Sequence, residues 1–166
     1  MHAMIPATEV RDVLHERLRA VFSSEALLAA LGVKAPVVSK GFPVNEPPFY
    51  VAVDEICDTA QTSGATSMAS ATVDFVVHVW CFSEHRDLKV AADTLMAYVG
   101  VVFASVIADR TIGGNVTSSL PSVREAGTAS NGSKRYYASA VVDVTCFVSS
   151  SCPCEIKEII DELESN

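Results

Sequence analysis

The sequence is short of positive charge. Twelve lysines and arginines stand against twenty aspartates and glutamates among 166 residues, which leaves a formal net charge of −8. Proteins that hold DNA or RNA by its phosphates normally carry a basic stripe, whereas the basic residues here are spread thinly along the chain. Stable nucleic-acid binding is therefore not expected. An acidic surface still suits a protein past which DNA slides, because like charges repel.

Cysteines are few and odd in number. Five of them do not make a disulfide framework in a chain of this length. Cys81 and Cys146 fall inside strand patterns, where a cysteine is most often a small buried hydrophobe. Cys152 and Cys154 could help to hold a metal, but no second pair has zinc-like spacing and the four histidines are scattered. The pattern favours a helix entry with Pro153 at its first position, and no metal or cofactor is predicted.

No uncharged stretch is long enough to span a membrane. Hydrophobic residues make up 49% of the chain, so a span has to be considered. The longest uncharged run in the most apolar region, 94–108, is shorter than the ~20 residues that a span needs, and Asp93 and Asp109 bracket it. The first residues lack a basic segment followed by an apolar one, so we expect no secretory signal. The length fits a single domain over residues 1–166 with a buried apolar helix.

The spacing of apolar residues predicts an α+β fold. Helices are expected at residues 8–22, 24–31, 88–107 and about 153–164, the last short and acidic. Strands are expected at residues 49–56, 72–82, 115–126 and 135–148, with at most a short edge strand near 37–38. The polar stretches 57–70 and 127–134 are predicted to be flexible hairpin tips. The expected architecture is a mainly antiparallel sheet of four to five strands, packed against an N-terminal helix, one long central helix and a short C-terminal helix.

The helix expected at 88–107, with Ser83 as its cap, is apolar on nearly every side. The side predicted to face the sheet comprises Leu88, Ala91, Ala92, Leu95, Val99, Val102, Phe103 and Val106. The opposite side is predicted to carry Val90, Ala97, Val101 and Ala104. A helix with two apolar sides needs cover on both, and small residues let another backbone approach closely. The second cover is either another copy of the chain or the first or last helix of the same chain.

No residue pattern marks an active site. Asp74 and His78 share one face of a predicted strand but lie ~13 Å apart, too far for a hydrogen bond. Asp143 could meet His78 across strands, yet no nucleophile stands beside them in a recognisable spacing. A histidine on a half-buried sheet face is more often structural, so no catalytic residue is predicted. A small enzyme or ligand-binding domain that uses this face, with Trp80, stays an alternative.

Taken as a whole, the chain resembles the tail-terminator, or tail-completion, proteins of long-tailed bacteriophages and prophages. The likeness begins with an N-terminal helix, EVRDVLHERLRAVF, and a proline-containing approach to a strand, NEPPFYVAVDE. It continues through the strand-to-helix unit TVDFVVHVWCFSEHRDLKVAADTLMAYV and closes with RYYASAVVDVTCFV. The stretch 57–70 and the acidic tail after Val148 are additions to that pattern.

The resemblance implies a structural protein without enzymatic activity. Such a protein forms a ring, typically of six copies, at the head-proximal end of the tail tube, where it ends tube polymerisation. The implied partners are the chain itself, the tail tube protein and a head connector or stopper protein, while genomic DNA passes through without stable binding. The implied location is the virion tail, after assembly in the bacterial host cytoplasm, with no membrane. A neck or head-completion protein of the same virion differs only in its partner and stays an alternative.

Three features of the residues agree with a ring subunit. The two-sided apolar helix needs a neighbour, which makes Val90, Ala97, Val101 and Ala104 the predicted oligomer interface. The acidic balance suits a channel that passes DNA. The hairpin tips could reach neighbouring rings and become ordered on binding, which gives that role to Thr62, Ser63, Gly64, Asn131 and Gly132.

Overall fold

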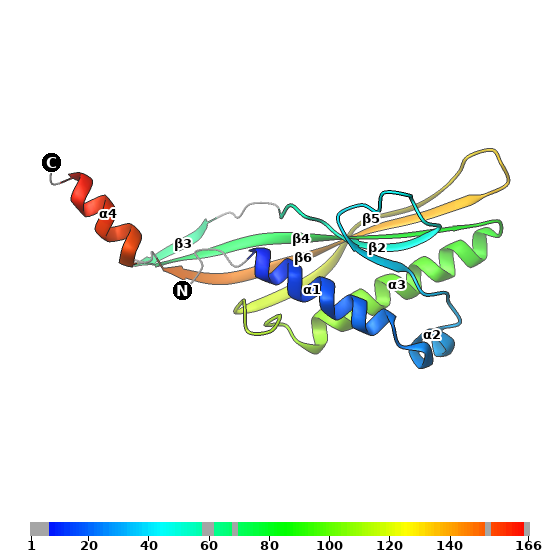
Figure 1. Cartoon of the computed structure of the whole chain (residues 1–166), viewed down its shortest axis with the longest axis horizontal. Helices are drawn as coiled ribbons and strands as arrows, with labels where there is room; N and C mark the ends of the chain where they lie inside the picture. Colours follow the sequence, from blue (N-terminus) through cyan, green and yellow to red (C-terminus); the bar gives the residue numbers. More distant parts are fainter. Residues whose placement is uncertain (1–6, 58–61, 68–69, 152–153, 165–166) are drawn as a thin grey trace.

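A long, narrow sheet is the central element of the computed structural model (Figure 1). The structure describes residues 7–57, 62–67, 70–151 and 154–164. The helices are α1 (Ala7–Phe22), α2 (Glu25–Leu31), α3 (Leu88–Ala108) and α4 (Cys154–Glu164). The strands are β1 (Val37–Lys40), β2 (Phe49–Val53), β3 (Thr62–Ser67), β4 (Ser70–His85), β5 (Ser118–Ser130) and β6 (Tyr136–Ser151). The strand order is β1-β2-β4-β6-β5, and β3 pairs with β4 outside this path. The pairing of β1 with β2 is parallel and the other pairings are antiparallel, so the predicted α+β class is confirmed.

The long β4–β6 ladder decides where α3 begins. The two strands pair over their whole length, from Ser70 opposite Ser151 to His85 opposite Tyr136. Ser83 is therefore a buried strand residue, and the prediction that it caps the helix is wrong. Asp87 takes that place, because its carboxylate accepts a hydrogen bond from the backbone nitrogen of Lys89 at 2.9 Å. The ladder continues two residues past Ser83 and moves the helix start with it.

Both predicted hairpin tips are shorter than expected. Residues 62–67 form β3, with Thr62 opposite Val73 and Ser63 opposite Thr72. Thr62, Ser63 and Gly64 thus belong to a strand rather than to a loop, because backbone pairing does not depend on apolar side chains. The second tip is shorter because β5 continues to Ser130. The turn that follows contains Asn131 and Gly132, and Gly132 has a φ of 75°.

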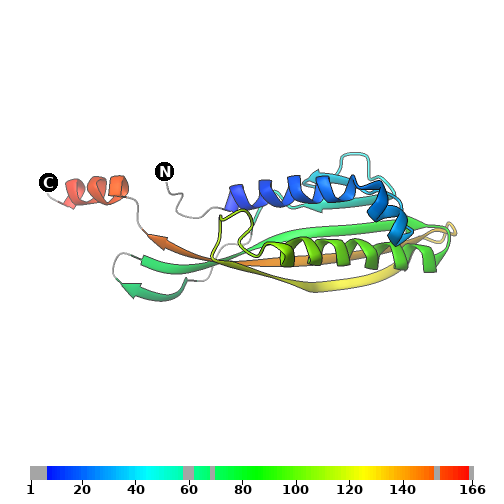
Figure 2. The ribbon, with the colours of Figure 1, turned by 90° about the horizontal axis from the view of Figure 1, so that it is seen from below.

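The helices α1 and α3 lie on one face of the sheet, and the main hydrophobic core lies between them and the strands (Figure 2). On the strands, this inner face is made by buried residues: Phe75, Val77, Val79, Cys81, Ala138, Ala140, Val142, Val144 and Cys146. Burial raises the pKa of the Cys81 and Cys146 thiols to about 12, so both are inert apolar groups. From α3, the core receives Ala91, Leu95, Val99, Val102 and Val106. Leu88 is exposed, contrary to prediction, because it is the first residue of the helix.

One long side of α3 is covered by α1 of the same chain. The Phe22 ring packs edge-on against Tyr98, with ring centroids 5.5 Å apart. One Nη atom of Arg17 donates to the Ser105 carbonyl at 3.3 Å, and the other to the Asp109 carboxylate at 2.8 Å. Val101 lies between Tyr98 and Ser105 along this side and is 7% exposed. For Val101, the alternative that the first helix of the same chain covers this side of α3 is therefore correct.

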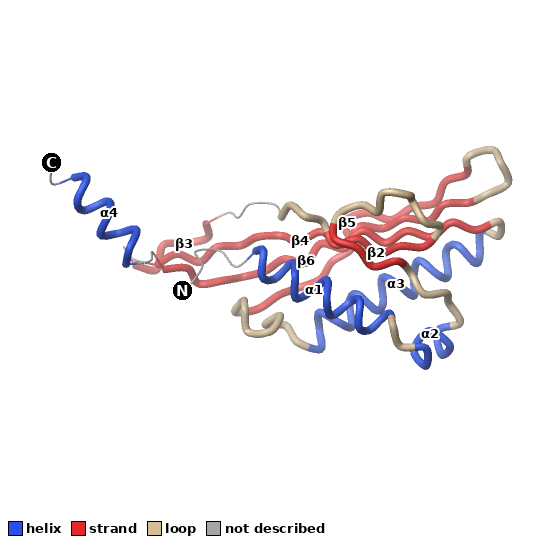
Figure 3. Tube along the Cα trace, viewed as in Figure 1, coloured by secondary structure: helices blue, strands red, loops and turns tan. Residues whose placement is uncertain are grey.

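The C-terminal helix α4 follows β6 and lies beyond the end of the sheet in Figures 1 and 3. It begins at Cys154, close to the predicted start. Cys152 and Pro153 lie outside the described residues. Among the residues that the structure describes, no group of histidine, cysteine and carboxylate side chains is arranged to hold a metal ion.

By length and hydropathy alone, α3 could cross a membrane. Its most apolar window has a mean hydropathy of 1.9. Half of that window is buried within the molecule, against the sheet and α1. The fold thus uses α3 as a core helix with one exposed side.

Asp109 closes the end of α3 and ties the following turn to α1. Its carboxylate accepts hydrogen bonds from the Thr111 hydroxyl at 2.7 Å, the Gly113 backbone nitrogen at 2.8 Å and Arg17. The Thr111 hydroxyl first, then the Gly113 amide and Arg17, hold the Asp109 pKa below its usual 3.8. This contribution to stability is therefore present above pH 3.8 and is lost as the pH falls through the lower folded pKa.

We predict that Asp109→Asn lowers the free energy of unfolding at neutral pH. The difference from the wild type should shrink as the pH falls below 3.8, because the carboxylate of the unfolded wild type then takes up a proton while that of the folded protein keeps its charge down to its lower pKa. Urea unfolding of both proteins across that pH range measures the difference. Glu125→Gln, at an exposed carboxylate of β5, is the control and should change little. A pH-independent difference would contradict this assignment.

Candidate assembly surfaces

A line of exposed apolar residues runs along α3 on the side away from the core. It consists of Met96, Gly100, Ala104 and Ile107, which we call the α3 stripe. Their spacing of four, four and three residues keeps them on one side of a helix. Met96 is 63% exposed and Ile107 is 60% exposed. Two large apolar side chains exposed on the same side of one helix are unusual. This stripe is the first candidate surface for another protein.

The predicted oligomer interface overlaps the α3 stripe only in part. Ala104 belongs to it, Val90 is exposed near the start of the helix, and Ala97 is half-buried at its border. Val101 is buried against α1 and does not belong to this surface, because α1 covers that side of α3. The sequence analysis missed Met96 and Ile107. Their spacing with Ala104 was the available signal, but it is informative only once the position of α1 is known.

The face of the sheet opposite to α1 and α3, here called the outer face, carries a band of aromatic rings. Tyr50 and Phe82 stack across β2 and β4 with centroids 4.9 Å apart, and Tyr137 on β6 continues the band at 5.8 Å from Phe82. Phe42, from the segment between β1 and β2, packs on Trp80 at 5.1 Å. These cross-strand pairs stabilise the sheet where no helix in the described part of the chain lies on it.

His78 and Asp143 meet on the outer face, as the sequence suggested. They are register partners on β4 and β6, and the His78 Nδ1 atom lies 2.7 Å from an Asp143 carboxylate oxygen. The Arg124 Nε atom lies 3.6 Å from the same oxygen. His78 is only 6% exposed, so the pair is suited to joining two strands rather than to meeting a substrate. The register partner of Asp143 on β5 is Ser122, which places the carboxylate between serine and histidine. That order differs from a nucleophile–base arrangement.

We predict that Asp143→Ala lowers the free energy of unfolding by about 1–3 kcal/mol, because a largely buried hydrogen bond to His78 is lost. Equilibrium urea unfolding measures this change. Arg124→Ala is the matched control, since it removes only the longer and more exposed contact to the same carboxylate and should cost less than about 1 kcal/mol. Equal losses for the two variants would contradict a structural role for the His78–Asp143 contact.

Two further polar atoms of the outer face are buried. Asp74 lies on β4 four residues nearer to Ser70 than His78, and one of its oxygens is buried without a hydrogen-bond partner. The Trp80 Nε1 atom is likewise buried without a partner. A shallow hollow of about 320 Å³ lies beside Trp80 and is lined by Glu125, Ala126, Gly127, Ser139, Ala140 and Val141. Glu125 is the one ionisable side chain among these described lining residues, so the hollow lacks the elements of an acid–base site.

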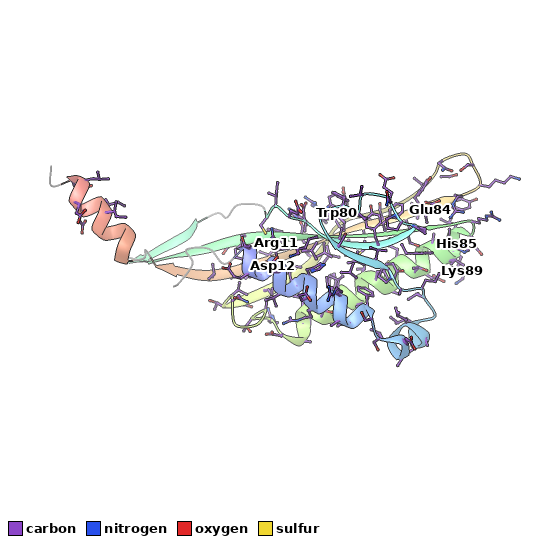
Figure 4. All side chains as sticks on the ribbon, in the orientation of Figure 1. Arg11, Asp12, Trp80, Glu84, His85 and Lys89 are labelled. Atoms are coloured by element: carbon purple, nitrogen blue, oxygen red, sulfur yellow. The ribbon has the colours of Figure 1, made fainter. Side chains whose placement is uncertain are left out.

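The β5–β6 turn forms the end of the molecule opposite to α4. Asn131 donates a hydrogen bond to the Tyr137 hydroxyl, and Arg135 pairs with Glu84 at the base of the turn. Figure 4 shows Glu84, His85 and Lys89 together at this end. Asn131 and Gly132 are exposed, as a contact to a neighbouring ring requires. That contact stays a prediction.

Similarity to known proteins is found among solved structures. No protein-family model matches the chain, and no curated protein matches it. Among solved structures, the chain is similar to one described as "Virion of native gene transfer agent (GTA) particle". The two share 17% sequence identity with a TM-score of 0.41, and the match covers 82% of this chain and 93% of the other. At this identity and TM-score the likeness does not assign a function.

Proposed function

We propose that the chain is a structural virion protein that assembles with copies of itself into a ring at the head-proximal end of a phage tail tube. The ring is hexameric in the family that the sequence resembles. It would end tube polymerisation and offer its far side to a head connector or stopper protein. The observation that carries the proposal is the α3 stripe, where Met96 and Ile107 stand exposed on a helix that otherwise packs in the core. Exposed apolar surfaces of this kind are typical of protein–protein interfaces.

The charge and shape of the molecule support the same role. A net charge of −8 opposes stable binding of DNA and suits a channel through which DNA moves. The sheet extends well beyond α1 and α3 at the β3 end, and the β5–β6 turn projects at the other end (Figure 1). Extensions at both ends would allow contacts to the tail tube on one side of a ring and to the connector on the other.

Two alternatives make different use of the same structure. A neck or head-completion protein of the virion would use the same ring surface and differ only in its partner. A small-ligand-binding domain would instead use the outer face, where the Asp74 oxygen and the Trp80 Nε1 atom are buried without partners. That second possibility predicts a stable monomer with a ligand on the outer face.

Light scattering of the purified protein separates these roles. A ring subunit should give a mass several times the 17.6 kDa of the chain, and negative-stain images should show closed rings. A protein that remains monomeric up to the concentrations reached in an infected cell would overturn the proposal. For a phage that encodes the chain, removal of its gene should yield tails of uncontrolled length if it is a tail terminator. Tails of normal length without heads would favour the neck protein.

A further inference from the structure

The C-terminal helix α4 has an exposed apolar side of its own. Ile159, Ile160 and Leu163 recur at helical spacing, and Leu163 is 73% and Ile159 58% exposed. An isolated helix of 11 residues is marginal in water, so most of its stability has to come from packing against another surface. The apolar side of α4 is therefore expected to contact another part of the assembled protein.

The charge of α4 restricts what that surface can be. Its sequence, CEIKEIIDELE, holds five acidic residues and one lysine, a net charge of −4 that is half of the −8 of the chain. A strongly acidic helix is repelled by anionic lipid headgroups and by DNA. It fits an apolar surface that has basic side chains at its borders.

The α3 stripe has these properties. Its exposed apolar length from Met96 to Ile107 is about 16 Å, similar to the ~16 Å length of α4. Arg86 precedes the stripe by ten residues and Lys89 by seven, and Arg110 follows Ile107 by three. All three are exposed. The carboxylates next to the stripe, Asp93 and Asp109, are paired with Lys89 and Arg17. Arg110, whose Nε atom donates to the Ser119 carbonyl, is then the charge best placed to meet the carboxylates of α4.

In the arrangement described, α4 does not reach the α3 stripe of its own chain. The helix α4 lies beyond the β3 end of the sheet, whereas α3 starts near the opposite end of the molecule (Figures 1 and 2). Lys89 marks that opposite end in Figure 4. The two unpaired surfaces therefore complement each other between two copies rather than within one.

We propose that α4 of one copy packs its Ile159, Ile160 and Leu163 side on the α3 stripe of the next copy. The proposal rests on the self-assembly proposed above and names the segment that covers the stripe. Such a contact joins two different surfaces, and its repetition gives a closed ring where the rotation between copies returns to the first copy. It also gives a role to the acidic tail, which is an addition to the pattern of the resembled family.

Site-specific photo-cross-linking tests this contact in the full chain. A benzoylphenylalanine replaces Leu163, and equal amounts of ¹⁵N-labelled and unlabelled protein are assembled together before irradiation. Mass spectrometry should then find cross-links between labelled and unlabelled chains that join α4 to the peptide containing Met96 and Ile107. Cross-links within one chain, or to the outer face of the sheet, would overturn the proposal.

A pair of variants measures the contribution of α4 to assembly. Replacing Ile160 and Leu163 together by Asp should raise the Kd of self-association about tenfold or more, because both are exposed apolar groups of the proposed contact. Asp161→Glu keeps the charge of α4, lies off its apolar side and should change the Kd less than about twofold. If the wild type assembles and the double variant assembles equally well, the α4 contact is wrong while the ring proposal stands. A monomeric wild type removes both.

Discussion

Replacing Ala104 by Glu is expected to stop self-assembly and leave a folded monomer. Ala104 is an exposed, small residue in the middle of the α3 stripe, between Met96 and Ile107. A glutamate there places a charge and a longer side chain in the centre of the proposed interface, where an unpaired buried charge costs several kcal/mol. Light scattering should show the mass of one chain, while circular dichroism and the melting temperature stay close to those of the wild-type subunit.

Ala30→Glu is the matched control for this experiment. Ala30 is also an exposed alanine within a helix, α2, but it is not part of the α3 stripe. The same substitution there should leave the assembled mass unchanged. Unchanged assembly of the Ala104 variant would show that the α3 stripe is not an interface. Unfolding of that variant would show that the stripe is packed inside its own subunit.

Truncating Tyr98 to alanine is expected to cause the largest loss of stability. Tyr98 is fully buried between α1 and α3, and its ring packs edge-on against Phe22. Its hydroxyl donates a hydrogen bond to the Lys34 carbonyl at 2.6 Å and so ties the segment after α2 to the core. Burial raises the Tyr98 pKa, which keeps the hydroxyl protonated as a donor. Loss of a large aromatic side chain from such a site costs about 3–5 kcal/mol.

Tyr98→Phe separates the two parts of that loss. It keeps the ring against Phe22 and removes only the hydrogen bond to Lys34, so it should cost about 0.5–1.5 kcal/mol. Urea unfolding of both variants, at a concentration where the subunit is monomeric, gives the two free energies. A phenylalanine variant as unstable as the alanine variant would show that the hydrogen bond to Lys34, rather than the packing of the ring, supplies the stability.

The elements that sequence patterns predicted best are those governed by local chemistry. Helix α2 was expected at 24–31 and spans Glu25–Leu31. Ser24 caps its start and Gly32 ends it in the left-handed conformation at φ 66°, and both effects act within one turn of the chain. Strand β5 was expected at 115–126; it contains Pro121, lies at the sheet edge and is irregular between Val123 and Glu125. The alternation along β4 and β6 likewise identified the inner face, since side chains in a strand point alternately to its two faces.

Local sequence patterns do not predict contacts between segments that are distant in the chain. The sequence left open whether Val101 faces a neighbour or its own subunit, because helical spacing shows which residues share a side but not what covers it. Only the position of α1, held by Arg17 and Phe22, decided that Val101 is buried and that Met96 and Ile107 are exposed. Likewise, spacing allowed a meeting of His78 and Asp143, and only the β4–β6 register made them partners.

The sequence by itself therefore determined the α+β class, the apolar inner face and the acidic character of the protein. These follow from local periodicity and from composition, which need no knowledge of distant contacts. The tertiary structure decided which side of α3 remains exposed and how far β3 and β5 extend into the expected hairpin tips. It also placed α4 apart from the core that it does not cover. These features depend on which segments pack together, and that choice is made by the whole chain at once.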